Sequence, residues 1–104
     1  MKNREVFNIT WEGIEIEIGY IPSYCEAYRK YQGVDLSHVE VRSISPRNVP
    51  IPITETGYRS MWIRAPQLAE HGGVVEYVTS YIEHEANSEQ WKQQQEAEKQ
   101  YQLF

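Results

Sequence analysis

Cysteine is almost absent from this sequence, since Cys25 is the only one among 104 residues. A lone thiol forms no internal disulfide and supplies no thiolate cluster for a metal, which predicts a reducing compartment. Long apolar runs are also missing, because no stretch approaches the roughly 20 residues that cross a bilayer. The charged start, 1–4, precedes no apolar signal segment. We therefore expect a cytoplasmic protein with no membrane segment.

Positive charge is scarce as well. Ten Lys and Arg residues stand against fifteen Asp and Glu residues, which gives a net charge of −5. An excess of negative charge repels nucleic-acid phosphates, so we expect no direct nucleic-acid partner. The acidic residues form no long run, and a solvated surface explains them most simply. An acidic inhibitor of a host defence system, which would imitate the charge of DNA, is a lesser alternative.

Apolar and polar residues alternate in four segments, as they do in strands that bury one face. Two of these segments, 7–11 and 14–18, flank a turn at 12–13 and predict a β-hairpin. The other two cover 38–42 and 58–63. Strands with one apolar face and one charged face are typical of an antiparallel sheet.

Helical spacing is clearest from residue 74 onward, where Val74, Val78 and Ile82 recur on one face. A polar helix is expected to follow and to reach about residue 99. Asn87 or Ser88 can cap this helix by accepting hydrogen bonds from its free amide groups.

These patterns predict an α+β fold, in which an antiparallel sheet of about four strands carries a packed helix on one face. A polar C-terminal helix completes it. We divide the chain into a single α+β domain, 1–87, and a C-terminal helix and tail, 88–104. A weaker pattern predicts a short helix over 23–32, and prolines favour a rigid extended loop over 46–52.

The densest polar segment, 54–60, directly follows this loop. Beside the strand at 38–42 it would supply an acid or base, cations and hydroxyls, which are the groups that recognise phosphate or carboxylate. The candidate ligand pocket comprises His38, Glu40, Arg42, Glu55, Tyr58 and Arg59. In the favoured alternative the segment only pins the loop: its threonines satisfy backbone groups, and Arg59 pairs with Glu55 or Glu40.

No catalytic residue, metal ligand or cofactor is predicted. His38 and Glu40 are two residues apart and share one face of a strand, which suits two metal ligands, but no third ligand is expected near them. Cys25 is better explained as a packed or partly exposed thiol than as a nucleophile. The balance favours a protein without enzymatic activity.

The last five residues, 100–104, place two apolar side chains at the end of a polar helix. Gln100, two variable residues, Leu103 and Phe104 resemble the short peptide with which many bacterial replication and repair proteins bind the replicative sliding clamp. The resemblance implies that Gln100 is a polar anchor and that Leu103 and Phe104 fill an apolar pocket. Alternatively, the two apolar side chains fold back on the sheet or pair with a second copy of the chain.

The segments 38–43 and 50–60 resemble small proteins of bacterial plasmids and prophages. The shared runs are His, aliphatic, Glu, aliphatic, Arg, Ser and then Pro-Ile-Thr-Glu-Thr-Gly-Tyr-Arg-Ser, and some of these proteins also end in Leu-Phe. The resemblance implies no particular activity. We therefore expect a non-enzymatic accessory protein of a bacterial or mobile-element genome, docking a larger host protein through its tail. A small module or enzyme that binds an anionic ligand is the main alternative.

Overall fold

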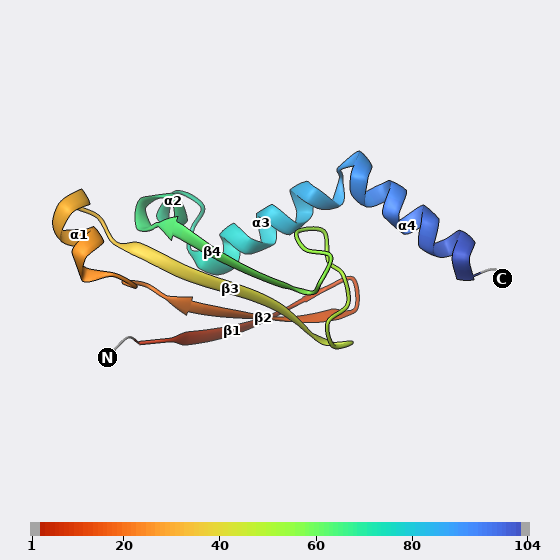
Figure 1. The fold of residues 1–104 in the computed structure, drawn as a ribbon, viewed down its shortest axis with the longest axis horizontal. Coiled ribbons are helices and arrows are strands. Elements are labelled where there is room, and N and C mark those ends of the chain that lie inside the picture. The colour runs from red at the N-terminus through yellow and green to blue at the C-terminus, as the bar shows by residue number, and fades with distance from the viewer. Residues whose placement is uncertain (1–2, 103–104) are drawn as a thin grey trace.

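A computed structural model describes residues 3–102 of the chain, with the side chains of residues 3–99. Its centre is a four-stranded antiparallel sheet in the order β1-β2-β3-β4 (Figure 1). The strands are β1 (Glu5–Trp11), β2 (Ile14–Ile21), β3 (Leu36–Ser45) and β4 (Tyr58–Arg64). The predicted α+β fold with an antiparallel sheet of four strands is confirmed.

A two-residue turn joins the first two strands, with Trp11 and Ile14 as the closing pair. Both turn residues have positive φ angles, 46° at Glu12 and 79° at Gly13. Such a turn matches the right-handed twist of the flanking strands, and glycine tolerates this backbone conformation well. The predicted β-hairpin is therefore formed by local turn chemistry as well as by alternation.

Four helices complete the described chain: α1 (Glu26–Gln32), α2 (Ala65–Glu70), α3 (Val74–Ala86) and α4 (Glu89–Gln102). The side chain of Ser88 accepts a hydrogen bond from the backbone N–H of Trp91 at 3.2 Å, which confirms Ser88 as a cap of the last helix. None of the helices within residues 3–102 has the length and apolar character that a membrane crossing requires.

The core lies between one face of the sheet and α3, which runs along that face (Figure 1). Val78 and Ile82 are fully buried one helical turn apart, as the sequence spacing predicts. The loop between β3 and β4 adds apolar side chains to the same layer. The buried apolar residues are Ile16, Ile18, Val39, Val41, Ile51, Ile53, Ile63, Leu68, Val74, Val78 and Ile82.

Strand β3 is longer than the alternation of its valines indicates, because two of its inward positions are serines. Ser37 and Ser43 are both fully buried. Ser37 donates a hydrogen bond to the carbonyl of Pro22 at 2.8 Å, and Ser43 donates one to the carbonyl of Val49 at 2.8 Å. Buried hydroxyls are stable when they are paired in this way. The two serines therefore tie neighbouring loops to the sheet.

Helix α4 leaves the body of the molecule and extends beyond the end of the sheet (Figure 1). It contributes to an elongated shape of 56 × 25 × 20 Å. Near its start, the ring of Trp91 meets the ring of Trp11 edge-on, with 6.0 Å between centroids. This contact anchors the first turn of the helix to the β-hairpin.

Candidate functional site

The sheet face opposite α3 is not covered by any helix in the described part of the chain, and we call it the open face. Strand register sets its polar residues in rows, because partners on neighbouring strands point to the same side. Its cross-strand pairs between β3 and β4 are His38 with Trp62, Glu40 with Ser60, and Arg42 with Tyr58.

A chain of polar contacts runs across this open face. The Nε2 atom of His38 lies 2.7 Å from the hydroxyl of Ser60, and Tyr58 donates a hydrogen bond to Glu40 Oε2 at 2.9 Å. That hydrogen bond, partial burial and the negative charge of Glu40 raise the pKa of Tyr58 above its ordinary value. Tyr58 therefore stays a neutral hydrogen-bond donor over the whole physiological pH range.

The distance between Ser60 and His38 is one that a nucleophile and its base would have. A catalytic triad also needs an acid that orients the histidine. Here His38 Nδ1 lies 3.8 Å from Glu40 Oε1, which is too long for a hydrogen bond. The other oxygen of that carboxylate is already occupied by Tyr58. The geometry fits a polar network better than an acyl-transfer centre.

Aromatic side chains border the network. The indole of Trp62 is 55% exposed although it stacks on the ring of His38, with 4.8 Å between centroids. Tyr24 packs against both of these rings. The guanidinium of Arg42 lies over the ring of Tyr58 at 4.8 Å, and no ion pair involves Arg42 among the described residues. Arg42 is therefore a cation with donors available to an anion.

The structure divides the six residues of the predicted pocket between two places. The open face brings together His38, Glu40, Arg42 and Tyr58. Arg59 points to the other side of the sheet, because neighbouring residues of a strand alternate between faces. There it donates a hydrogen bond to the carbonyl of Ile53 at 3.0 Å. Glu55 lies exposed in the loop before β4, where it lines one groove together with Arg59 and Tyr58.

The loop before β4 shows the backbone pairing expected of a structural network. Thr54 and Thr56 both donate hydrogen bonds to the carbonyl of Tyr58, at 2.9 and 3.2 Å. Arg59 takes a different partner from the one expected, because its guanidinium pairs with a loop carbonyl and not with Glu55 or Glu40. The loop is thus held by hydroxyls and a guanidinium.

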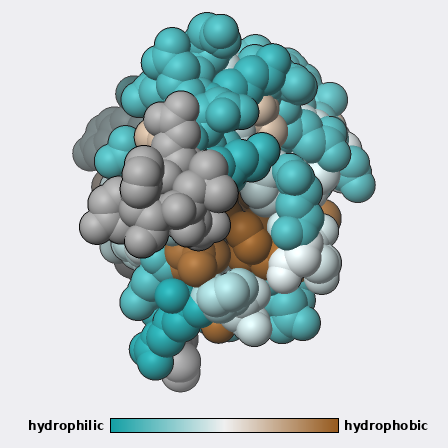
Figure 2. Space-filling model, turned by 90° about the vertical axis from the view of Figure 1, so that its right-hand side faces the viewer, coloured by the Kyte–Doolittle hydropathy of each residue, from teal (hydrophilic) through white to brown (hydrophobic). Residues whose placement is uncertain are grey.

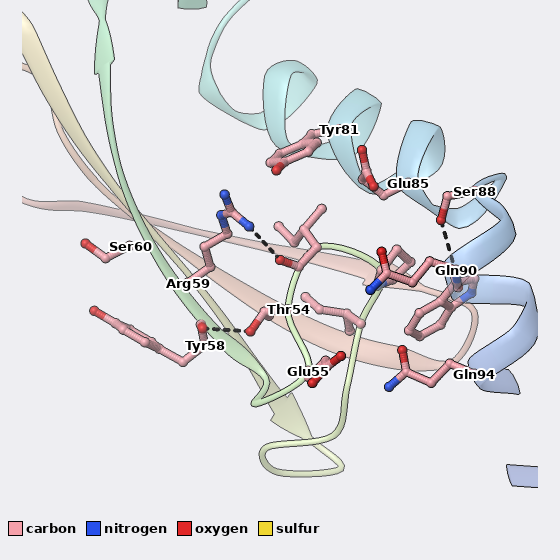
Figure 3. Close-up of a pocket in the computed structure, with 14 residues that line it drawn as sticks. Thr54, Glu55, Tyr58, Arg59, Ser60, Tyr81, Glu85, Ser88, Gln90 and Gln94 are labelled. Carbon is pink, nitrogen blue, oxygen red and sulfur yellow. Dashed lines mark hydrogen bonds between the residues drawn. The ribbon is translucent and has the colours of Figure 1, made fainter. Parts of the chain in front are cut away.

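A groove lies on the side of β4 where Arg59 points. It has a volume of about 630 Å³ and separates the loop at 51–55 from α3 and α4 (Figure 3). Tyr81 contributes to one wall and Trp91 to another. Sequence patterns do not reveal this groove, because it depends on how α4 crosses the end of the sheet. Two signals were available: the polar segment 54–60, whose Glu55, Tyr58 and Arg59 line the groove, and Trp91, the only large apolar residue between 88 and 100.

A second hollow of about 590 Å³ lies under α4 at the hairpin end, with Trp11, Ile14 and Val49 in its lining. Figure 2, which faces the end where α4 projects, shows hydrophobic residues gathered in the middle of a largely hydrophilic surface. An exposed apolar surface of this kind is what the fold-back alternative for the tail requires. Leu103 and Phe104 lie outside the described residues, as does the side chain of Gln100.

Histidine, cysteine, aspartate and glutamate are the side chains that usually hold metal ions in proteins. Within residues 3–102, no three of these side chains come close enough together to hold a metal ion. His38 lies on β3 and His84 in the last turn of α3, while His71 follows α2 and packs on Tyr77. The three histidines thus lie in three different parts of the fold.

The fold and its surfaces define a small α+β domain with an open antiparallel sheet and no buried ionic centre among the described residues. Residues 4–91 match the model of the KlcB third domain, and the chain therefore belongs to that family. KlcB is a plasmid-associated protein, which confirms the expected relation to plasmid proteins at the level of the family. No curated protein and no solved structure gives a significant match. Membership of this family points to a plasmid-associated accessory protein.

The matched segment covers the sheet and α1 to α3 and ends in the first turn of α4, at Trp91. It includes every residue of the open-face network. It also includes the loop and strand that form one side of the groove. The remainder of α4 and the tail lie beyond the matched segment.

Proposed function

We propose that the protein is a non-enzymatic accessory protein that docks a larger host protein through the end of α4 and the residues that follow it. The observation that carries this proposal is the projection of α4 away from the sheet (Figure 1). Beyond Trp91 the described helix is polar, and most of its side chains are exposed. Such a helix gains little from packing on its own domain, so it is suited to present its end to a partner.

The replicative sliding clamp is the leading candidate partner, because Gln100, Leu103 and Phe104 resemble a clamp-binding peptide. Two adjacent apolar side chains contribute about 1.5–3 kcal/mol each when they are fully buried. Part of this energy is offset by the ordering of the tail on binding. A weak, exchangeable contact is the expected result.

Replacement of Leu103 and Phe104 by alanine in one double variant should lower the affinity for the purified clamp at least tenfold. The reason is that a loss of about 1.4 kcal/mol already changes the dissociation constant by a factor of ten. Isothermal calorimetry with the intact chain measures this effect. Lys92→Ala together with Gln93→Ala is the control, because both residues lie on α4 outside the motif. Clamp binding that survives the double variant, or no binding by the intact chain, would refute the proposal.

A second function is supported by the open face, namely the binding of a small anionic ligand. The supporting observation is the Arg42 guanidinium, which has no carboxylate partner among the described residues and lies over the ring of Tyr58. Ser60, two residues from Tyr58 on the same face of β4, adds a hydroxyl, and His38 lies further along the face in contact with Ser60. Only these open-face residues enter this second proposal, because Arg59 and Glu55 lie elsewhere.

Arg42→Gln should abolish saturable binding of phosphate or acetate at the open face, because it removes a guanidinium that forms no ion pair with the described carboxylates. The readout is the change in amide chemical shifts of β3 and β4 during titration of the full chain. Arg47→Gln is a matched control, since Arg47 is also exposed but lies in the loop after β3. Equal shifts in the two variants would show that the anions bind without a site.

A further inference from the structure

The groove beside β4 combines a cation, carboxylates, amides and aromatic rings in a volume of about 630 Å³. This size lies within the range of roughly 300–1,000 Å³ that is usual for ligand pockets. Tyr58 and Ser60 of β4 contribute to the lining of the groove, but its cation is Arg59, which points to the side of the sheet opposite the open face. Neither proposed function uses Arg59.

Arg59 supplies the positive charge of the groove. One of its N–H groups donates to the carbonyl of Ile53, and its guanidinium lies over the ring of Tyr81 at 5.5 Å. A guanidinium carries five N–H donors in a planar fork, so most of them remain for a ligand. The fork matches the two oxygens of a carboxylate. The loop carbonyl and the tyrosine ring hold the guanidinium in position before a ligand arrives.

Negative and amide groups surround this cation. Glu55 and Glu85 line the groove from the loop and from α3, while Gln90 and Gln94 line it from α4. Figure 3 shows Arg59, Glu85 and Gln90 around the same space. Glutamine side chains both donate and accept hydrogen bonds, as a peptide backbone does. A ligand with one carboxylate and several N–H and C=O groups would satisfy all of these residues.

We propose that this groove binds an extended peptide segment of a partner protein that carries a glutamate or aspartate side chain. The carboxylate of the peptide pairs with Arg59, and its backbone pairs with Gln90 and Gln94. Tyr81 and Trp91 cover the apolar parts of the neighbouring side chains. The two groove carboxylates accept hydrogen bonds from backbone N–H groups of the same peptide.

The same charges disfavour a polyanion. Two glutamates beside a single arginine leave the groove with a net negative charge, so a phosphate dianion or a nucleic-acid strand is repelled. A peptide with one carboxylate and otherwise neutral amides is repelled far less by Glu55 and Glu85 than a polyanion is. The net charge therefore disfavours a nucleic acid more strongly than a peptide with one carboxylate, and that carboxylate is attracted locally by Arg59.

The test uses the full chain and two pentapeptides with blocked ends, each having two alanines on either side of a central residue. The central residue is glutamate in one peptide and glutamine in the other. Binding is followed by NMR, through the chemical shifts of the side-chain N–H groups of Arg59, Gln90 and Trp91. The glutamate peptide should bind at least fivefold more tightly, since a charge-assisted bidentate pair is roughly twice as strong as a neutral hydrogen bond.

Two variants and one control test whether the peptide binds in the groove. Arg59→Lys keeps the charge but loses the planar fork, and it should weaken the glutamate peptide about tenfold. Gln90→Ala changes an exposed helix residue, so it tests the backbone contact without a risk to folding. Arg64→Gln removes an arginine of the open face and should leave binding unchanged. Thermal unfolding of each variant verifies that it is folded.

Equal affinity for the two peptides, or no saturable shift with either, would overturn the proposal. Larger groove shifts with inorganic phosphate or with oligothymidylate would also overturn it, because the groove would then be an anion or nucleic-acid site. Clamp binding is tested with variants of different residues, Leu103 and Phe104 in the tail. The outcome for the groove is therefore independent of the outcome for α4.

Discussion

Gly57→Ala is expected to lower the free energy of unfolding by about 2–5 kcal/mol. Gly57 has a φ of 77°, in the left-handed region, which costs an L-residue roughly 1–2 kcal/mol. A Cβ atom there would lie 2.7 Å from the carbonyl carbon of Asn48 and 2.5 Å from the hydroxyl of Ser43. Backbone atoms cannot move aside as a flexible side chain can, so overpacking adds about 1–3 kcal/mol.

Gly33→Ala is the matched control for this prediction. Gly33 has a nearly identical φ of 76°, but nothing lies within 4 Å of the position of its Cβ. Urea denaturation should therefore show only the conformational cost at Gly33 and a clearly larger loss at Gly57. Equal losses at the two positions would mean that close packing against Asn48 contributes nothing to stability.

The size of the effect at Gly57 follows from its place at the base of the loop. Its carbonyl accepts the backbone N–H of Ser43 at 2.8 Å, and the hydroxyl of Ser43 holds the carbonyl of Val49. Ile51 and Ile53 of the same loop are buried in the core. A shift at Gly57 would therefore disturb the loop wall of the groove as well as the core.

Local sequence patterns were sufficient for the sheet and for α3. Alternation identified the hairpin because Phe7, Ile9 and Trp11 of β1 face the same layer as Ile14, Ile16 and Ile18 of β2, and a two-residue turn set the register. The spacing of Val74, Val78 and Ile82 identified the helix that covers that layer. In both cases the periodicity that predicts the element lies within the residues of the element itself.

The placement of the candidate site residues was harder to predict from the sequence, although strand alternation indicated part of it. Strand alternation alone places Tyr58 and Arg59 on opposite faces, although both residues contribute to the lining of the groove. The groove needs contacts between distant parts of the chain. Trp11 and Trp91 are in contact although they lie near opposite ends of the chain, and no local pattern reports such a contact.

Strand β4 connects the two candidate surfaces. Its outward residues belong to the open face, and Arg59 belongs to the groove on the other side. Point variants on neighbouring strands can therefore separate the two binding hypotheses, since Arg42→Gln on β3 acts on one surface and Arg59→Lys on β4 acts on the other. Neither change touches α4 beyond Trp91, so the tail can be tested independently of both.

Ile82→Ala should lower the free energy of unfolding by about 2–5 kcal/mol, the usual cost of removing a large aliphatic side chain from a core. Ile82 is fully buried, and its side chain belongs to the cluster that joins α3 to the sheet. A domain of this size has a total stability of only about 5–15 kcal/mol. The loss should therefore be evident as a much lower midpoint in urea denaturation.

Glu83→Ala is the matched control, because Glu83 is the next residue of the same helix and is exposed. Its cost should stay within about 0.5 kcal/mol, as for most surface substitutions. Ile82 is also flanked on α3 by Tyr81 and Glu85, which line the groove. If packing of α3 positions the groove, Ile82→Ala should weaken the glutamate peptide at temperatures where the variant is still folded. A loss of stability below about 1 kcal/mol would contradict the assignment of Ile82 to the core.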